Sequence, residues 1–274
     1  MLKVRILTSI VLIPCFLAAL FLLPDIYWAL LMLVFILIAI WEWSIMAGWS
    51  TVARYIYLVA TAALGLALAF GSDAQMGYIQ QHGLFWGILA ATLFWVILAP
   101  LWLMSRYHIK NLLSMAFAGW LVMLPTWLAL ISLRRISPWL LLVIIATIWL
   151  ADSAAYFAGK RFGKHKLAAQ ISPSKTWEGV LGAWIAVSVY GISLCLWLGL
   201  NPWLIVGLWG ITVISIMGDL LESLLKRQAG LKDSGDLLPG HGGLLDRIDG
   251  LTSALPLAAF FIYFPLYYAM LWHD

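Results

Sequence analysis

Nine long apolar runs constrain what this chain can fold into more than any other feature of its sequence. Each is close to the roughly 20 residues that an α-helix needs to cross the hydrocarbon core of a bilayer. Backbone groups in lipid must be hydrogen-bonded internally, and runs of this length exclude a β-barrel. We therefore predict about nine transmembrane helices, at 6–23, 27–47, 52–70, 84–104, 112–133, 138–158, 178–199, 203–225 and 250–272.

The composition excludes an ordinary soluble protein. Only 10% of the residues are charged and 64% are apolar, whereas soluble domains have about 25% charged residues. We expect an all-α polytopic membrane protein in which residues 1–274 form a single integral membrane domain, with N-terminal helices in 1–137 and candidate catalytic helices and loops in 138–274. Lys3 and Arg5 before the first run imitate a secretory signal, but no small-x-small cleavage site follows, so we predict a retained span.

The distribution of Lys and Arg predicts the orientation of these helices. With the N-terminus in the cytoplasm, 14 of the 16 Lys and Arg residues fall on the cytoplasmic side, and only Arg134 and Arg135 fall on the other. Cytoplasmic loops of membrane proteins carry the excess of positive charge. The charged segments 159–176 and 226–249 are therefore expected to face the cytoplasm, where nucleotides are found.

The most polar stretch of the chain runs from Ser223 to Asp249, between two apolar spans. Its 27 residues include two Lys, two Arg, four Asp, one His and five Gly. A charged, glycine-rich segment at the edge of a membrane suggests that it binds a ligand. We expect a phosphate-rich ligand together with a divalent cation.

Acidic residues concentrate in the second half of the chain, where eight of the 12 lie between Asp152 and Asp249. An acid within an apolar helix costs at least about 2.5–3.5 kcal/mol, so it needs a partner or a cation. Asp152 falls inside the predicted span 138–158, and Asp219 falls toward the end of the predicted span 203–225. For Asp219 with Asp246 we favour a metal ion, since oxygen ligands suit Mg²⁺. Asp249 is either a third ligand, a partner of Arg247 or a helix cap.

The same helical face that carries Asp219 also carries Glu222 and Lys226, at positions i, i+3 and i+7. A simple ion pair between Glu222 and Lys226 is as good an interpretation of Glu222 as a functional role. Basic residues that would pair with negatively charged phosphates lie near these acids. They are Lys226, Arg227, Lys232 and Arg247.

Two short segments have the composition of phosphate-binding loops. SPSKT places Ser172, Ser174 and Lys175 just before a predicted helix, whose positive N-terminal end suits a phosphate. PGHGG surrounds His241 with glycines, including Gly242 and Gly243, which let backbone amides turn toward an anion. His241 is equally well explained as a catalyst or as an ordinary loop residue. A membrane-surface anchor and a phosphate-binding role are equally good interpretations of four further bases, Lys160, Arg161, Lys164 and Lys166.

Motifs of other enzyme classes are missing from the sequence. It contains no Walker A loop, no HExxH and no GxSxG. A transporter is a different-class alternative, because intramembrane Asp residues are common there. In a transporter the acidic residues would be spread over facing helices, whereas the acidic residues of this chain crowd toward one membrane face. Mg²⁺-assisted phosphoryl or nucleotidyl transfer fits the residues best.

The Ser223–Asp249 stretch resembles the signature of the phosphatidate cytidylyltransferases, or CDP-diglyceride synthases, of bacterial type. The resemblance rests on Ser223, Leu225, Lys226, Arg227, Lys232, Asp233, Gly235, Leu238, Pro239, His241, Gly242, Gly243, Leu244, Asp246, Arg247, Ile248 and Asp249. Two further blocks, 151–156 (ADSAAY) and 171–176 (ISPSKT), are similar to the same family. The first 140 residues match it mainly in hydropathy and in Trp41-Glu42-Trp43.

The resemblance implies that CTP and phosphatidic acid react to give CDP-diacylglycerol and pyrophosphate in the cytoplasmic membrane of a bacterium. It implies Mg²⁺ as cofactor, a possible second cation such as K⁺, a homodimer, and no nucleic-acid partner. The candidate catalytic residues are Asp219, Asp246, Lys226, Arg227 and His241, and the candidate metal ligands are Asp219, Asp246 and Asp249. Candidate substrate-binding residues are Asp152, Ser172, Ser174, Lys175, Ser223, Lys232, Asp233, Gly242, Gly243 and Arg247.

Two enzyme classes with related substrates are alternatives. CDP-alcohol phosphatidyltransferases carry DGxxAR followed by GxxxDxxxD, and this chain lacks that pattern. A CTP-dependent polyprenol or dolichol kinase could share the fold. The filled 27-residue pattern favours the cytidylyltransferase.

Overall fold

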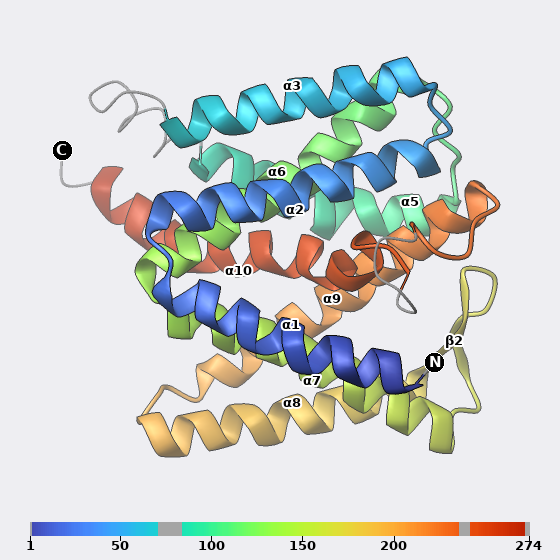
Figure 1. Ribbon diagram of the computed structural model, residues 1–274. Coiled ribbons are helices and arrows are strands. Elements are labelled where there is room, and N and C mark those ends of the chain that lie inside the picture. Colours follow the sequence, from blue (N-terminus) through green and yellow to red (C-terminus); the bar gives the residue numbers. More distant parts are fainter. Residues whose placement is uncertain (1, 71–83, 236–241, 272–274) are drawn as a thin grey trace.

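The structure, a computed structural model, describes residues 2–70, 84–235 and 242–271, with side chains between Ile10 and Pro265. It is a bundle of long helices that run roughly along one direction (Figure 1). The long helices are α1 (Leu2–Leu22), α2 (Asp25–Met46), α3 (Thr51–Phe70), α6 (Leu112–Ile136), α7 (Pro138–Phe162), α8 (Trp177–Leu198), α9 (Trp203–Gln228) and α10 (Leu245–Leu271). One more span, Leu84–Ser105, contains the π-helical turn η1 (Phe94–Leu98) and ends in α5 (Ala99–Ser105).

The predicted membrane class is confirmed. Within the described residues, eight helices are long and apolar enough to cross a bilayer. The first predicted span falls in α1, whose described apolar part, Ile10–Leu22, is shorter than the other eight. Because α1 begins and α10 ends at opposite ends of the bundle, the arrangement fits an odd number of crossings (Figure 1).

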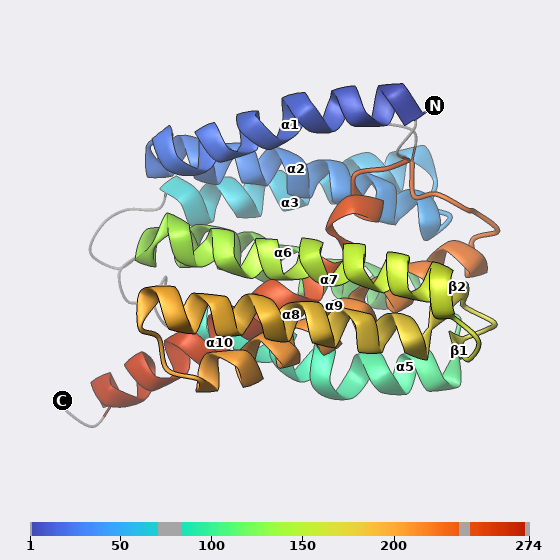
Figure 2. The same ribbon diagram turned by 90° about the horizontal axis from the view of Figure 1, so that it is seen from below.

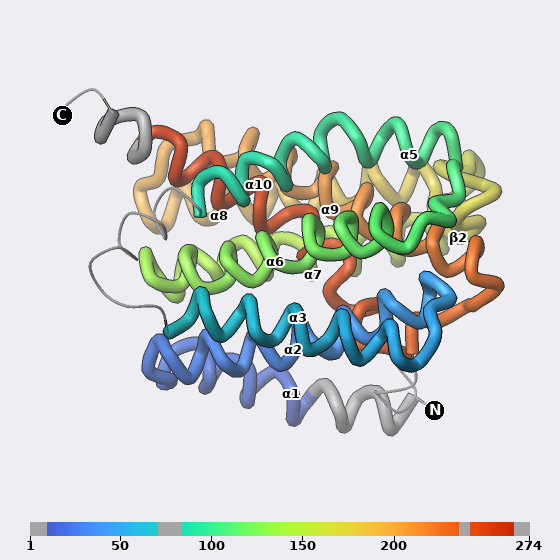
Figure 3. Tube along the Cα trace, turned by 90° about the horizontal axis from the view of Figure 1, so that it is seen from above, coloured from blue at the N-terminus to red at the C-terminus, as the bar shows by residue number. Residues whose placement is uncertain are grey.

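The helix that begins at the polar stretch forms the core of the bundle. Residues 252–259 of α10 are all buried, and α10 packs against α9, α6, α7 and α2. Views from two opposite sides show α1, α2 and α3 on one flank and α8 and α5 on the other (Figures 2 and 3). Other helices therefore pack against α10 from several directions.

Tryptophan side chains join α2 to α6 through hydrogen bonds. The indole N–H of Trp127 donates to the carbonyl oxygen of Ala29 at 2.9 Å, and that of Trp43 donates to Met115 O at 3.1 Å. Association of helices in lipid depends on close packing and on such interhelical hydrogen bonds. The contacts fix α2 against the helix that lies beside α10.

The sequence did not predict the one sheet in the described part of the chain, a two-stranded hairpin between α7 and α8. Strand β1 (Lys166–Ala168) is antiparallel to β2 (Ser172–Thr176). The segment SPSKT, expected as a loop, is therefore a strand. Thr176 then caps α8, because its side-chain oxygen accepts a hydrogen bond from the Gly179 N–H at 3.1 Å. The strand and the cap together fix Lys175 just before the helix.

Small residues allow α7 and α8 to lie close together beside this hairpin. A Cβ atom on Gly179 would be 2.9 Å from the carbonyl oxygen of Ala155, and one on Gly182 would overlap the side chain of Ala158. Small residues at a membrane helix interface let the backbones approach. The pair forms a stiff support for the hairpin.

Most of the basic residues lie at one end of the bundle. The start of α1, the connection from α2 to α3, the segment after α5, the hairpin and the end of α9 are all at that end (Figure 1). Arg134 and Arg135 lie at the other end, in the last turn of α6. This agrees with the predicted separation of charges and leaves two exceptions to explain.

The two exceptional arginines differ in burial, and Arg134 has a structural role. Its side chain is only 6% exposed, its Nη1 lies 2.7 Å from Asp25 Oδ1, and its Nε donates to Leu20 O at 2.8 Å. A further N–H donates to Leu23 O. The last carbonyl groups of a helix lack intrahelical partners. Arg134 donates hydrogen bonds to such carbonyls at the end of α1 and so ties this end to α2 and α6.

Replacement of Arg134 by Met is expected to lower the stability of the protein by about 1.5–3 kcal/mol, the range for hydrogen bonds to a charged group. The thermal midpoint measured by tryptophan fluorescence in detergent should fall by several degrees. Arg135→Met is the matched control, because Arg135 is 55% exposed and its Nε lies 3.8 Å from Asp25. Equal midpoints for the two variants would contradict this role of Arg134.

Candidate active site

The predicted site residues gather at the end of the bundle that carries the hairpin. Here β2 contacts α7, α8 and α9, and α9 packs along α10. Two halves meet: the hairpin segment on one side, and the end of α9 with the start of α10 on the other (Figure 1).

Lys226 is the central base of the α9–α10 half. Its Nζ lies 2.5 Å from Asp246 Oδ1 and 3.3 Å from Glu222 Oε1, and its side chain is only 12% exposed. The ion pair between Glu222 and Lys226 that the sequence left open is therefore present. Lys226 links successive turns of α9 to the first turn of α10.

Asp246 holds the polar loop in place with its other oxygen. Oδ2 accepts hydrogen bonds from Ser234 N at 2.9 Å, Ser234 Oγ at 3.1 Å and Gly243 N at 2.9 Å. Gly242 has a φ of +82°, and a Cβ there would lie 2.8 Å from Asp246 Oδ2. Glycine is favoured at that φ because L side chains are strained there. The glycine pair thus lets the backbone wrap around the carboxylate.

Lys175 joins the hairpin half to α9. It forms an ion pair with Asp219 Oδ2, and the two side chains are 20% and 31% exposed. Ser223, one turn further along α9, donates from Oγ to Asp219 Oδ1 at 3.3 Å. Asp152, on α7, is exposed and lies within electrostatic range of both Lys175 and Asp219. The hairpin strand is therefore tied to the middle of the acid cluster.

Asp249 and Glu222 bring two carboxylates together where α9 crosses α10. Asp249 interacts with Glu222, Asp219 and Lys175, and Glu222 is only 5% exposed. The helices approach closely here, because a Cβ on Gly218 would overlap the carbonyl oxygen of Asp249. Among the described residues, the charged partner of Glu222 is Lys226, whose Nζ lies 3.3 Å from Oε1.

Asp219 and Asp246, expected to share a cation, are each paired with a lysine, Lys175 and Lys226 respectively. Among the described residues there is no group of three or more His, Cys, Asp or Glu side chains that could hold a metal ion. Mg²⁺ commonly uses one or two carboxylates and completes its shell with substrate phosphates and water. The metal ligands therefore stay a prediction.

The remaining candidates lie around this centre and differ in exposure. Ser172 is half-buried, Gly242 and Gly243 form the turn before α10, and His241 lies outside the described residues. The exposed candidates on the same end of the bundle are Ser174, Arg227, Lys232, Asp233 and Arg247.

Two residues with central contacts were missed from the sequence. Ser234 is 1% exposed and bonds Asp246, while Glu42 is 3% exposed and accepts hydrogen bonds from Ser234, Leu244 and Leu245. Glu42 carried a signal, since it is a lone acid within an apolar span. Ser234 carried none, because a serine in a polar loop is ordinary.

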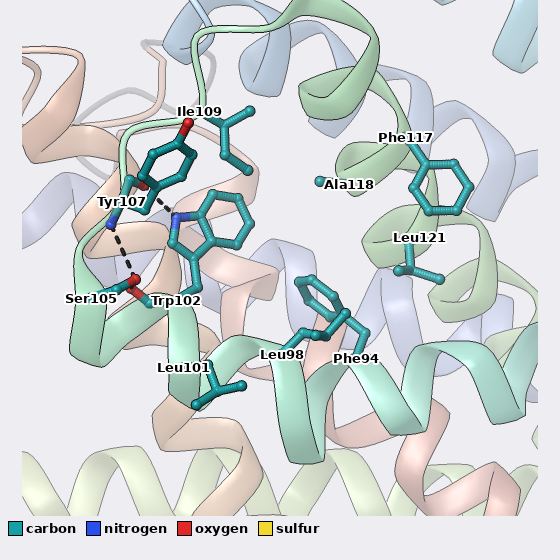
Figure 4. Close-up of a pocket in the computed structure, with 10 residues that line it drawn as sticks. All are labelled: Phe94, Leu98, Leu101, Trp102, Ser105, Tyr107, Ile109, Phe117, Ala118 and Leu121. Atoms are coloured by element: carbon teal, nitrogen blue, oxygen red, sulfur yellow. Dashed lines mark hydrogen bonds between the residues drawn. The ribbon is translucent and has the colours of Figure 1, made fainter.

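An apolar cavity of about 490 Å³ lies apart from the charged cluster, between the Leu84–Ser105 span and α6. Its walls include Phe94, Leu98 and Phe117, and its one polar end has Trp102 donating to Tyr107 O at 2.7 Å (Figure 4). The residues that line it include no Lys, Arg, His, Asp or Glu, so it lacks the charged groups that would bind a phosphate. The charged cluster is therefore the candidate active site.

The sequence matches the model of the cytidylyltransferase family over residues 3–265. It is 37% identical over 265 residues to the phosphatidate cytidylyltransferase of Pseudomonas aeruginosa, covering 94% of this chain and 96% of that protein. It is 36% identical to the protein of the same name from Haemophilus influenzae, covering 97% of this chain and 100% of the relative. With a multi-pass helical bundle and a charged cluster at one of its ends, the chain belongs to the cytidylyltransferase family.

Proposed function

We propose that this protein transfers the cytidylyl group of CTP to phosphatidic acid, releasing pyrophosphate and forming CDP-diacylglycerol for phospholipid biosynthesis. The names of its relatives support this activity. The observation that carries it is the pair of Lys–Asp contacts, Lys175–Asp219 and Lys226–Asp246. They hold two basic segments together at one end of a membrane bundle, where a soluble nucleotide can meet a lipid headgroup.

The reaction exchanges one phosphorus–oxygen bond for another. An oxygen of the lipid phosphate attacks the α-phosphorus of CTP, and the bond from that phosphorus to the bridging oxygen of the β-phosphate breaks. The electron pair leaves with pyrophosphate. The nucleophile is already anionic, so no general base is needed. The main barriers are repulsion between two anions and their in-line alignment, which preorganised cations reduce.

The lysines are the groups best placed to reduce this repulsion. Lys226 and Lys175 are largely shielded from solvent, where a charge acts more strongly than in water. We assign Lys175 with Ser172 and Ser174 to the nucleotide phosphates, and Lys226 to the lipid phosphate or the leaving pyrophosphate. The surrounding groups proposed to bind substrate are Asp152, Ser223, Arg227, Lys232, Asp233, His241, Gly242, Gly243 and Arg247.

Mg²⁺ dependence is part of this proposal, with Asp219, Asp246 and Asp249 as the carboxylates that would hold the ion. Glu222, which is buried next to Asp249 and paired with Lys226, adds negative charge in this place, and that charge favours a cation. A bound Mg²⁺ would neutralise phosphate charge and orient oxygens. Lys175 and Lys226 would then pair less closely with these acids and would also contact phosphate oxygens.

The proposed location is the cytoplasmic membrane of a bacterium, with the hairpin end of the bundle in the cytoplasm. The concentration of basic residues at that end supports this orientation through the positive-inside rule. A second cation such as K⁺ and a homodimeric assembly stay predictions that follow from the family resemblance.

The test is an assay of the purified protein in detergent with phosphatidic acid, Mg²⁺ and each of the four ribonucleoside triphosphates. We expect a nucleotide-lipid product with CTP and pyrophosphate in equal amount, and loss of the product when Mg²⁺ is chelated. If no nucleotide yields a lipid product, the proposed function is wrong. Full activity with chelator present would remove Mg²⁺ alone from the proposal.

A further inference from the structure

Glu42 is a buried acid that the proposed reaction does not use. It lies near the end of α2, is 3% exposed, and is about 200 residues away in sequence from the groups it contacts. A buried carboxylate in a membrane helix is costly and marks a specific partner. Its hydrogen-bond partners among the described residues all belong to the polar stretch that carries Asp246.

The carboxylate of Glu42 caps the N-terminus of α10 from another helix. Oε1 accepts a hydrogen bond from Leu244 N at 2.9 Å, and Oε2 accepts one from Leu245 N at 2.7 Å. The first N–H groups of a helix have no intrahelical acceptor, and a negative charge at that end is favourable. Since Leu244 and Leu245 have no side-chain oxygen, the cap comes from α2.

Two glycines of the polar stretch make room for this carboxylate. A Cβ on Gly235 would lie 2.8 Å from Glu42 Oε1, and one on Gly243 would lie 2.6 Å from Oε2. Such distances are shorter than real Cβ contacts allow. The backbone on both sides of residues 236–241 is thus packed directly against Glu42.

Ser234 connects Glu42 to the candidate catalytic acid. Its Oγ lies 2.9 Å from Glu42 Oε2 and 3.1 Å from Asp246 Oδ2. The two carboxylates therefore share its single hydroxyl hydrogen. Asp246 in turn contacts Lys226. A continuous path of contacts therefore runs from α2 through Ser234 and Asp246 to Lys226.

We propose that Glu42 is a positioning residue for the reaction: by capping α10 and holding Ser234, it sets the place of Asp246 and, through it, of Lys226. This inference rests on the cytidylyltransferase activity proposed above. A misplacement of about 1 Å in a reacting arrangement can lower a rate about 100-fold. Loss of the Glu42 charge should therefore reduce kcat without removing any group that touches substrate.

The test compares Glu42→Gln with Ser44→Ala. Ser44 is a buried polar residue of the same helix whose Oγ donates to Trp41 O at 2.6 Å, so its loss perturbs α2 but not α10. For monodisperse protein at saturating CTP and phosphatidic acid, we expect kcat to fall about 10- to 100-fold in Glu42→Gln and to stay within about twofold in Ser44→Ala. Glu42→Asp should recover part of the rate.

Hydrogen exchange gives a readout that does not depend on activity. The amides in residues 242–250 should exchange faster in Glu42→Gln than in Ser44→Ala, even if the wild-type protein proved inactive with CTP. Ser234→Ala is the second variant if Glu42→Gln fails to fold, and it should lower kcat at least 10-fold. A wild-type kcat in folded Glu42→Gln or in Ser234→Ala, or unchanged exchange in Glu42→Gln, overturns the proposal.

Discussion

Asp246→Asn is expected to lower kcat for CDP-lipid formation by at least about 100-fold, comparable to the loss of a preorganised group that stabilises charge in a transition state. Asp246 accepts from Lys226, Ser234 and Gly243. An amide supplies one oxygen and one NH₂ group, so either Lys226 or the loop donors would face a donor instead of an acceptor. Both the position of Lys226 and the closure of the loop would change.

Asp25→Asn is the matched control for this loss. Asp25 is also paired with a basic side chain, Arg134, but at the opposite end of the bundle and 59% exposed. It should keep its kcat, measured at saturating substrates on monodisperse protein. If Asp246→Asn turned over at close to the wild-type rate, Asp246 would have no part in the reaction.

Asp219→Asn is expected to have a second large effect, again about 100-fold or more in kcat/KM. Asp219 pairs with Lys175 and accepts from Ser223, so it is the group on α9 that fixes the hairpin strand. Without its charge, Lys175 loses the contact that holds the two halves together, and one proposed Mg²⁺ ligand is weakened. The Mg²⁺ concentration for half-maximal rate should rise in parallel.

A double-mutant cycle separates this contact from a general effect. If Asp219 and Lys175 act as a unit, Asp219→Asn combined with Lys175→Met should lose much less than the product of the two single losses. Lys110→Met, an exposed base on the same end of the bundle, serves as the control for removing positive charge. If the rate loss in the double variant equalled the product of the two single losses, the pairing of Asp219 with Lys175 would be unimportant.

The helices could be predicted because length and hydropathy decide what spans a bilayer. The predicted span at 27–47 corresponds to Asp25–Met46 and that at 203–225 to Trp203–Gln228. The largest error was at α10, which begins at Leu245 instead of residue 250. Its first turn is stabilised by the carboxylate of Glu42 from another helix, and no local capping signal reveals such a partner.

The sequence identified which residues form the candidate site but not how its charged residues pair. Charge and glycine content identified the polar stretch, but the ion pair between Lys175 and Asp219 was not predicted. Sequence spacing could not show that Asp219 and Asp246 each face a different lysine, since that depends on how α9, α10 and β2 pack. The hairpin was missed because SPSKT contains a proline and two serines, which are typical of turns.

The most direct test of the central claim follows the two ends of the CTP triphosphate. Purified protein with phosphatidic acid would receive CTP labelled either at the α-phosphorus or at the γ-phosphorus. We predict that the α label enters the lipid and that the γ label leaves in pyrophosphate, because the bond between the α-phosphorus and the β-phosphate oxygen is broken. Transfer of the γ label to lipid would identify a CTP-dependent kinase and contradict the proposed reaction.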